Sequence, residues 1–416
     1  MLTRIPCQWG CLMLQRLLVL FCLCLPFCAH AEHPEQRLLA ALQSVQQGQL
    51  QQAKMQLQSL LGSEPQFRAA NLLYADVLKA QSRPLQQPGM GIAQSDELKG
   101  LLSEMTLRWQ ANGTDATANK IPAALGKLDE NYQHAIVVDL KRSRLYVFAN
   151  QTGQPQRIAD YFVSMGRAGA EKTRQGDLRT PLGVYFVQSY MPGSELEDKY
   201  GVGAYPLNYP NIWDARHGRT GHGIWLHGTD SGTYNRPPLA SEGCVVLPNK
   251  DLLAVGQYIA LGQTPVIIGY DLAWLDPAQW QAQQQTTDAV FEQWLSDWRS
   301  LNAASYLQHY SKTFNDGKKN YRQWSDYKQR VAQGKTFIDV NAKYVSLLMH
   351  PNEQVMVATY LQEYSSNNFS SQTWKRQYWQ KEDDGVWRII HEAEVNPQIQ
   401  ITRLARSGGI EETQAN

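Results

Sequence analysis

Cysteine is scarce in this sequence of 416 residues. Five of the six cysteines lie within the first 28 residues, and only Cys244 lies beyond them. Without the opening segment no intramolecular disulfide can form, because a single thiol has no partner. A lone thiol in an exported chain is open to oxidation unless it has a chemical role. Cys244 is therefore either a buried inert residue or, as its Gly-, Pro- and Ser-rich surroundings favour, a nucleophile.

An excess of charge of one sign is also absent. The chain has 39 Lys and Arg residues beside 38 Asp and Glu residues. This balance lacks the basic surplus of nucleic-acid-binding proteins, so we expect no nucleic acid partner. No glycine-rich phosphate loop supports nucleotide chemistry. No apolar run reaches the roughly eighteen residues of a membrane span, so we expect no integral membrane segment once the opening segment is removed.

The opening segment has the layout of a secretory signal peptide. Arg4 and Arg16 precede the apolar run 17–27, and Ala29-His30-Ala31 is a small-residue cleavage pattern. We predict a signal peptide at 1–31. The alternative is an uncleaved N-terminal anchor.

The region 32–115 has apolar residues at helical spacing. Gly48, Ala53, Leu60 and Pro65 are spaced like the second half of a tetratricopeptide (TPR) repeat. Only about one and a half such units fit, whereas a solenoid needs about three. We therefore expect a TPR-like helical cap or dimerisation element rather than a repeat array.

The region 116–270 is predicted to form a mostly β domain. Its expected strands are 135–139, 144–148, 158–165, 184–188, 224–226 and 264–268, followed or accompanied by one helix at 250–261.

The region 271–400 changes character. Helices are expected at 286–314 and 321–333, followed by long strands rich in Tyr, Trp and Val at 336–348, 354–365, 371–381 and 385–394. This order resembles the NTF2-like cone fold, whose members often bind ligands or dimerise. The tail 401–416 is polar, and we expect it to be mobile. The fold class predicted for the whole chain is multidomain α+β.

The stretch from His227 to Leu247 carries the candidate chemistry. His227 ends an apolar run, and Cys244 closes the tetrad Ser241-Glu242-Gly243-Cys244, 17 positions later. A thiol nucleophile needs a base for its proton and N–H groups for the oxyanion. His227 is the candidate base. Gly243 allows a close backbone turn, which leaves N–H groups near Cys244 free to point inward.

A metal site must also be considered, because His217, His222 and His227 are close in sequence. Strand alternation would place His222 and His227 on opposite faces. No His-Glu-x-x-His helix and no second cysteine are available, so we expect no metal. The same alternation makes His222 a poor candidate for the base.

Several motifs occur in an order that resembles the YkuD family of L,D-transpeptidases, over roughly residues 130–270. They are VVDL at 137–140, VSMG at 163–166, TPLGVYFV at 180–187, His227-Gly228-Thr229 and Ser241-x-Gly243-Cys244. The resemblance implies a periplasmic bacterial cysteine enzyme that acts on peptidoglycan stem peptides without a cofactor. It implies that Cys244 attacks the acyl donor, that His227 is the base and that the Gly228 carbonyl fixes the histidine tautomer. The backbone N–H groups of Gly243 and Cys244 are the oxyanion candidates.

The candidate substrate contacts are Trp225, Ser241 and Glu242, although Ser241 is expected to brace the loop. Two positions depart from the family pattern. Many members have histidine where Glu242 stands and arginine where Val246 stands. A carboxylate beside the thiol would raise its pKa, or Glu242 could meet the amine of an incoming stem peptide. The acyl acceptor therefore stays open.

The order of helical region, YkuD-like domain and NTF2-like domain resembles that of cell-shape-determining L,D-carboxypeptidases. Those enzymes trim tetrapeptides to tripeptides, with water as acceptor. Cross-linking and the attachment or release of wall-bound lipoproteins share the same core motif. A catalytically weak peptidoglycan-binding module is the alternative from another class. A homodimer through the helical or NTF2-like region is a further expectation.

Overall fold

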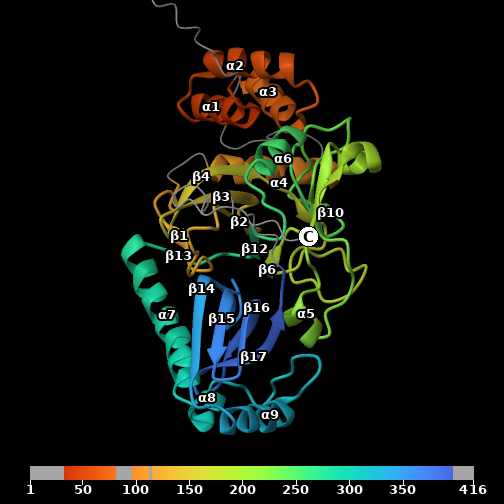
Figure 1. Cartoon of the computed structure of the whole chain (residues 1–416). Helices are drawn as coiled ribbons and strands as arrows, with labels where there is room; N and C mark the ends of the chain where they lie inside the picture. Colours follow the sequence, from red (N-terminus) through yellow and green to blue (C-terminus); the bar gives the residue numbers. More distant parts are fainter. Residues whose placement is uncertain (1–31, 81–95, 112–114, 397–416) are drawn as a thin grey trace, which may run out of the picture.

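The computed structural model describes residues 32–80, 96–111 and 115–396. Helices at the N-terminal end, a strand-rich middle region and a C-terminal antiparallel sheet with its own helices follow one another along the molecule (Figure 1). The chain is thus a multidomain α+β protein, as the sequence predicted. The predicted signal peptide at 1–31 and the polar tail at 401–416 lie outside the described residues.

The N-terminal region is helical. Its helices are α1 (Pro34–Gln46), α2 (Leu50–Ser63), α3 (Arg68–Ala80) and α4 (Asp96–Ala111). They share one apolar core, because each helix has its apolar residues on the face turned toward the others. Several contacts attach this region to the middle domain. Glu35 forms an ion pair with Arg144, and the ring of Phe67 stacks on that of Tyr234.

The middle domain is built on a five-stranded sheet in the order β4-β3-β2-β12-β6. The strands are β2 (His134–Asp139), β3 (Arg144–Gln151), β4 (Gln154–Phe162), β6 (Gly183–Phe186) and β12 (Pro265–Gly269). Strand β12 runs parallel to β2, and the other neighbours are antiparallel. Successive side chains of β2 alternate between two cores, Ile136 and Val138 in one and Val137 in the other. Apolar runs such as these form strands because both faces are covered.

A second, smaller sheet carries the candidate site. Its order is β11-β9-β8-β7, with β7 (Met191–Pro192), β8 (Gly203–Pro206), β9 (Trp225–His227) and β11 (Val245–Val246). A short parallel pair, β5 (Met165–Gly166) with β10 (Leu239–Ser241), lies beside it. The expected strand 158–165 is therefore divided between β4 and β5. The expected helix 250–261 is shorter, α6 (Asn249–Gly256), and α5 (Ile212–Arg216) was not anticipated.

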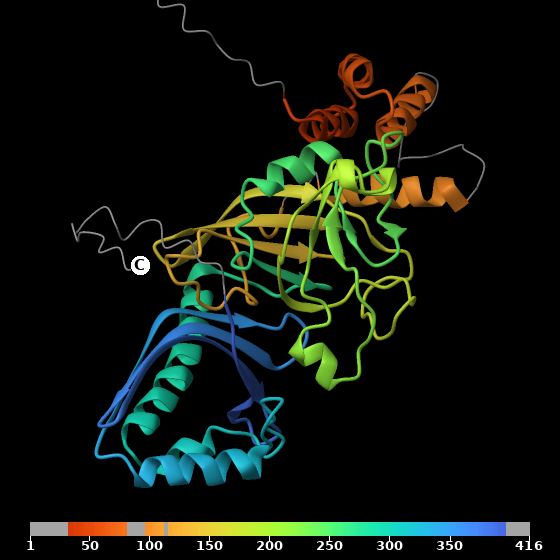
Figure 2. The same cartoon turned by 45° about the vertical axis from the view of Figure 1, so that its right-hand side comes forward.

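The C-terminal domain is a curved antiparallel sheet in the order β14-β15-β16-β17, with helices on its inner face (Figure 2). Its elements are α7 (Pro277–Arg299), α8 (Ala303–Gln308), α9 (Tyr321–Gln333), β14 (Ile338–Met349), β15 (Val355–Ser366), β16 (Phe369–Lys381) and β17 (Trp387–Glu394). The single helix expected at 286–314 is two helices, because the chain turns at Leu301, which has a positive φ of 62°. Aromatic side chains fill the space between sheet and helices.

The middle and C-terminal domains share an apolar core. Phe186 and Trp213 from the middle domain belong to the same buried cluster as Val357 and Tyr378 from the C-terminal sheet. The guanidinium of Arg376 lies 3.7 Å from the centroid of the Phe186 ring. The two domains are therefore joined by packing as well as by the chain.

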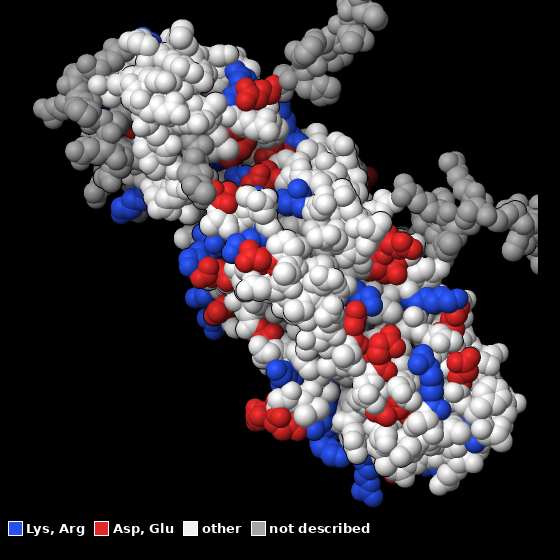
Figure 3. All heavy atoms as spheres, turned by 90° about the vertical axis from the view of Figure 1, so that its left-hand side faces the viewer, with Lys and Arg blue, Asp and Glu red and all other residues white. Residues whose placement is uncertain are grey.

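The surface has no single dominant charge on the face that Figure 3 shows, where acidic and basic side chains are interspersed. Within the described ranges, no helix combines the length and the apolar character that crossing a membrane requires.

Candidate active site

The candidate nucleophile and base are brought together by strand register. Strand β11 is parallel to β9, with Val245 opposite Leu226 and Val246 opposite His227. Cys244 directly precedes β11 and is therefore level with Trp225. Paired residues of neighbouring strands point to the same side, so the side chains of Cys244 and His227 are expected on one face. Leu226 and Val245 point into the buried core on the other face.

The turn before Cys244 depends on Gly243. Its φ is +130°, and a Cβ atom there would lie 2.7 Å from the carbonyl oxygen of Arg179. Ser241 braces this turn, because its Oγ donates to the Cys244 carbonyl at 2.6 Å and accepts from the Gly243 N–H at 3.1 Å. The Gly243 N–H is thus occupied, contrary to the expectation that it is free. The Cys244 N–H has no hydrogen-bond partner among the described residues.

His227 is buried, with 3% of its surface exposed. Its Nδ1 lies 2.7 Å from the carbonyl oxygen of Gly228. A carbonyl can only accept, so Nδ1 carries the proton and Nε2 is left as the basic nitrogen. Burial lowers the pKa of His227 to about 4, although the Gly228 carbonyl acts in the opposite direction. The ring is therefore neutral near pH 7 and able to accept a proton.

The Cys244 thiol is protonated at rest. Burial raises its pKa to about 11, with a smaller contribution in the same direction from Glu242, while the Trp225 N–H acts against it. The thiol donates to the Gly223 carbonyl, with 3.3 Å between sulfur and oxygen. A neutral thiol and a neutral imidazole do not form an ion pair, so a nucleophilic attack by this thiol would require its proton to be transferred at the same time.

Cys244 and His227 line one cavity of about 630 Å³. Four basic side chains also line it: Arg167, Lys172, Lys199 and Arg236. Glu242 is the acidic side chain of this lining; it is 75% exposed and lies 3.8 Å from Arg167. Each of the four basic side chains also lies near a carboxylate, that of Glu242, Asp177, Glu197 or Asp230, so their charge is largely balanced within the protein.

The other two candidate substrate residues do not line the cavity in the expected way. Ser241 is in the lining but buried, and its hydroxyl is committed to the turn. Trp225 is absent from the lining, and its ring lies 4.9 Å from that of Tyr200. Its contribution to the site is the backbone N–H beside the Cys244 sulfur.

The prediction that strand alternation places His222 and His227 on opposite faces is wrong, because the two residues do not lie in one strand. Strand β9 begins only at Trp225, so His222 lies in a loop to which strand alternation does not apply. His222 is exposed and lines the same cavity as Cys244. His217 lies apart from the lining, with its Nδ1 2.9 Å from the Trp213 carbonyl oxygen. In the described part of the chain, no group of His, Cys, Asp and Glu side chains could hold a metal ion.

Asn249 supports the loop after His227 and was not anticipated. Its Oδ1 accepts from the N–H groups of Val202 and Thr229, both at 3.1 Å, and its Nδ2 donates to the Thr229 carbonyl at 2.9 Å. No local motif indicates this role, because the partners come from separate loops.

The C-terminal domain has a separate cavity of about 660 Å³. Lys328 lies in it, 4.6 Å from the ring centroid of Trp298 and 4.5 Å from that of Trp324. Burial lowers the pKa of Lys328 to about 8. Glu392 lines the same cavity.

The geometry defines a cysteine–histidine site on a mostly β domain, and comparisons with known proteins identify its class. Residues 133–268 match the family model of the YkuD L,D-transpeptidase catalytic domain. Residues 286–393 match the model of the Cds6 C-terminal NTF2-like domain. The chain thus carries a YkuD L,D-transpeptidase catalytic domain followed by a C-terminal NTF2-like domain, as its sequence predicted.

Two solved structures extend the likeness across both domains. Bd1075 from Bdellovibrio bacteriovorus is 28% identical, with a TM-score of 0.61 over 66% of this chain and 98% of that one. The helical cell shape determining protein Pgp2 from Campylobacter jejuni is 20% identical, with a TM-score of 0.54 over 68% of this chain and 96% of that one. The likeness to Pgp2 shows a shared fold. No curated protein sequence matches this chain.

Proposed function

We propose that this protein is a periplasmic cysteine acyl-transfer enzyme that acts on the stem tetrapeptides of peptidoglycan. The observation that carries the proposal is the single cavity lined by Cys244 and by a buried His227 whose Nδ1 is held by the Gly228 carbonyl. The YkuD match and the Pgp2-like architecture support this substrate class. Arg167, which is 57% exposed in this cavity, is available to a peptide that ends in a carboxylate, although it also lies 3.8 Å from Glu242.

The first half-reaction forms a thioester. As the Cys244 sulfur attacks the carbonyl carbon of the third residue, Nε2 of His227 takes the thiol proton. In this proposal the Cys244 N–H receives the developing oxyanion, and the Gly243 N–H can join it only if Ser241 releases it. Collapse of the intermediate breaks the C–N bond, and the leaving D-alanine amine takes the proton from His227.

The second half-reaction transfers the acyl group to an acceptor. We favour water, so that tetrapeptide becomes tripeptide, over the amine of a second stem peptide. Glu242 stands at the cavity with most of its surface exposed, and Val246 is buried where many family members have arginine. Attachment or release of a wall-bound lipoprotein is the remaining acyl-transfer alternative.

The test uses Cys244→Ala and purified disaccharide-tetrapeptides. We expect the wild type to release tripeptide and the variant to release none while it stays folded by circular dichroism. A folded variant with wild-type turnover would refute the nucleophile. Among wild-type products, a cross-linked dimer or D-amino-acid exchange would replace hydrolysis by transpeptidation.

A second candidate function is a peptidoglycan-binding module with weak or no catalysis. The thiol pKa of about 11 and the cavity around Lys328 favour this alternative. It predicts that wild type and Cys244→Ala bind isolated cell walls equally and that neither changes the muropeptide profile.

A further inference from the structure

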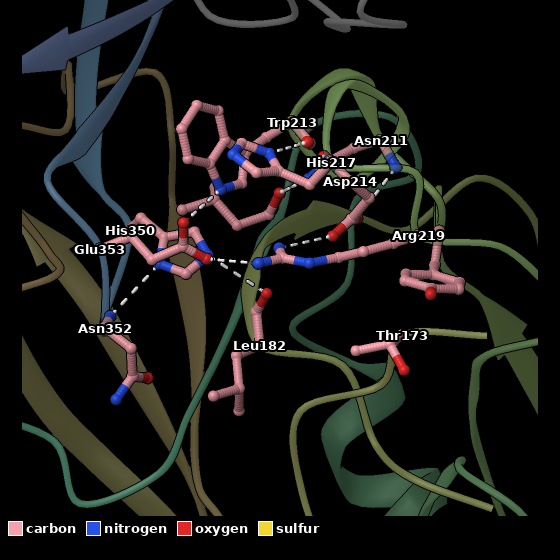
Figure 4. Close-up of polar contacts among 12 residues, drawn as sticks. Thr173, Leu182, Asn211, Trp213, Asp214, His217, Arg219, His350, Asn352 and Glu353 are labelled. Carbon is pink, nitrogen blue, oxygen red and sulfur yellow. Dashed lines mark hydrogen bonds and ion pairs between the residues drawn. The ribbon is translucent and has the colours of Figure 1, made fainter. Parts of the chain in front are cut away.

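The C-terminal domain reaches toward the candidate active site through one turn. Residues 350–354 connect β14 to β15 and lie against the catalytic domain (Figure 4). His350 Nε2 lies 3.2 Å from the carbonyl oxygen of Leu182, and Asn352 Nδ2 donates to the Tyr270 carbonyl at 3.1 Å. The turn is thus held at a fixed place on the catalytic domain.

Glu353 makes the charged contact of this turn. One carboxylate oxygen accepts from Trp213 Nε1 at 3.0 Å, and the other accepts from Arg219 at 2.6 Å. Arg219 also bonds to Asp214 at 3.2 Å, so it joins carboxylates from two domains (Figure 4). Burial alone would raise the pKa of Glu353, but the Arg219 hydrogen bond and the neighbouring His350 hold it below its ordinary value.

Arg219 begins the segment that forms one wall of the catalytic cavity. Gly221, His222 and Gly223 line that cavity, and the Gly223 carbonyl accepts from the Cys244 thiol. Gly221 and Gly223 have φ values of +100° and +75°, and His222 and Gly223 are exposed. Glycines in an exposed loop restrict the backbone little, so the position of this wall depends on its anchors.

The same segment supports a second part of the cavity. Thr220 N donates to the Thr173 carbonyl at 3.1 Å, and Thr220 Oγ1 accepts from the Gln175 N–H at 3.2 Å. Gln175 lines the cavity as well. The contacts therefore run without a gap from Glu353 through Arg219 and Thr220 to two loops that face Cys244.

We propose that Glu353 is a positioning residue: through Arg219 it fixes the cavity wall at 219–223, so that the C-terminal domain sets the geometry of the catalytic cleft. The effect on substrate turnover rests on the proposed function. The effect of Glu353 on the position of the loop 219–223 does not rest on that function. The carboxylates of Asp214 and Glu353 both bond to Arg219. Without the Glu353 charge, Asp214 is the remaining carboxylate that holds Arg219, and it belongs to the catalytic domain.

The test is Glu353→Gln in the full chain, because the amide keeps the size of the side chain and an acceptor for Trp213. We expect amide hydrogen exchange to rise at 219–223. We also expect iodoacetamide to alkylate Cys244 about fivefold faster, because loss of the Glu353–Arg219 contact loosens the loop that lies against the thiol. Toward tetrapeptide, KM should rise about fivefold with kcat within about twofold, because a cavity wall is misplaced while the Cys244–His227 pair is kept. Arg219→Lys should give an intermediate result, because lysine keeps the positive charge but lacks the two guanidinium nitrogens that bond to Asp214 and Glu353 at once.

The matched control is Glu363→Gln. Glu363 pairs with Lys343 at 2.9 Å and is 31% exposed, against 29% for Glu353, but it lies on β15 away from the turn. Equal exchange and alkylation in the two variants would overturn the proposal. So would a general rise in exchange with a lowered Tm, which would mean that Glu353 only joins the domains. Hydrogen exchange and alkylation test the role of Glu353 even if the wild type fails to act on tetrapeptides.

Discussion

At the scale of single residues, the candidate site contains a neutral imidazole, that of His227, and a neutral thiol, that of Cys244. Burial moves the pKa of His227 down and that of Cys244 up, so neither group is charged near neutral pH. This state protects a lone thiol from oxidation, because the thiolate is the reactive form. In the proposed reaction it also makes His227 necessary, since the thiol would lose its proton only to an adjacent base.

His227→Ala should lower turnover on the order of 100-fold, the usual cost of a lost general base. His222→Ala should cost less than about tenfold, because His222 is exposed on the cavity wall. Steady-state rates on disaccharide-tetrapeptides check both, with circular dichroism as the control for folding. If His222→Ala is the more damaging change in a folded protein, the assignment of the base is wrong.

At the scale of elements, α1 is attached to the catalytic domain by a buried ionic network. Glu35 pairs with Arg144 at 2.9 Å and with Arg108, and Arg108 pairs with Glu104 at 2.9 Å. Burial alone would raise the pKa of Glu35, but the two arginines hold it below its ordinary value. Asn235, in the loop between His227 and Cys244, donates to Glu104 at 2.7 Å. The N-terminal helices therefore brace a loop of the site.

Glu35→Ala should reduce the free energy of unfolding by on the order of 3 kcal/mol, because it removes the carboxylate that two buried arginines share and leaves Arg108 with Glu104 and Arg144 with the half-exposed Asp160. Glu64→Ala is the control, since Glu64 pairs with the exposed Lys250 and should cost less than about 1 kcal/mol. Urea denaturation of both variants measures the difference. Equal losses would show that the Glu35 network is not the anchor of α1.

At the scale of the whole molecule, buried histidines, His227 and His350 among them, tie stability to pH. Burial lowers the pKa of both His227 and His350 to about 4, whereas the unfolded chain binds the proton near pH 6.5. A depressed folded pKa gives stability that is present above the unfolded pKa and lost as pH falls. The protein should therefore weaken between about pH 6.5 and 4, by up to about 1.4 kcal/mol per pH unit for each histidine.

The measurement is urea denaturation at several pH values. The quantity compared is the slope of the free energy of unfolding against pH between about pH 6.5 and 4, rather than the free energy itself. His350→Gln should flatten the slope, because glutamine binds no proton in either state. His222→Gln should leave it unchanged, because His222 is exposed. An unaltered slope in His350→Gln would exclude His350 as a source of the acid sensitivity.

The sequence by itself determined the fold class and the two domain families of the chain, and it singled out candidate reacting groups. Apolar periodicity predicted the strands of the five-stranded sheet and of the C-terminal sheet, and most helices, because spacing along the chain reflects which face is buried. Of the smaller sheet it predicted only β9. One cysteine outside the opening segment and a histidine before a Gly- and Pro-rich loop were enough to single out Cys244 and His227. The roles given to them stay predictions until the variants are measured.

Only the tertiary structure decided how these groups are surrounded. It began β9 only at Trp225, so that His222 lies in a loop and lines the cavity, and it placed the Ser241 hydroxyl on the Gly243 N–H. It also brought Glu353 to Arg219, 134 positions away in the chain. Local patterns report burial and turn formation, whereas strand limits, side-chain partners and domain contacts depend on packing between distant segments, which no local pattern encodes.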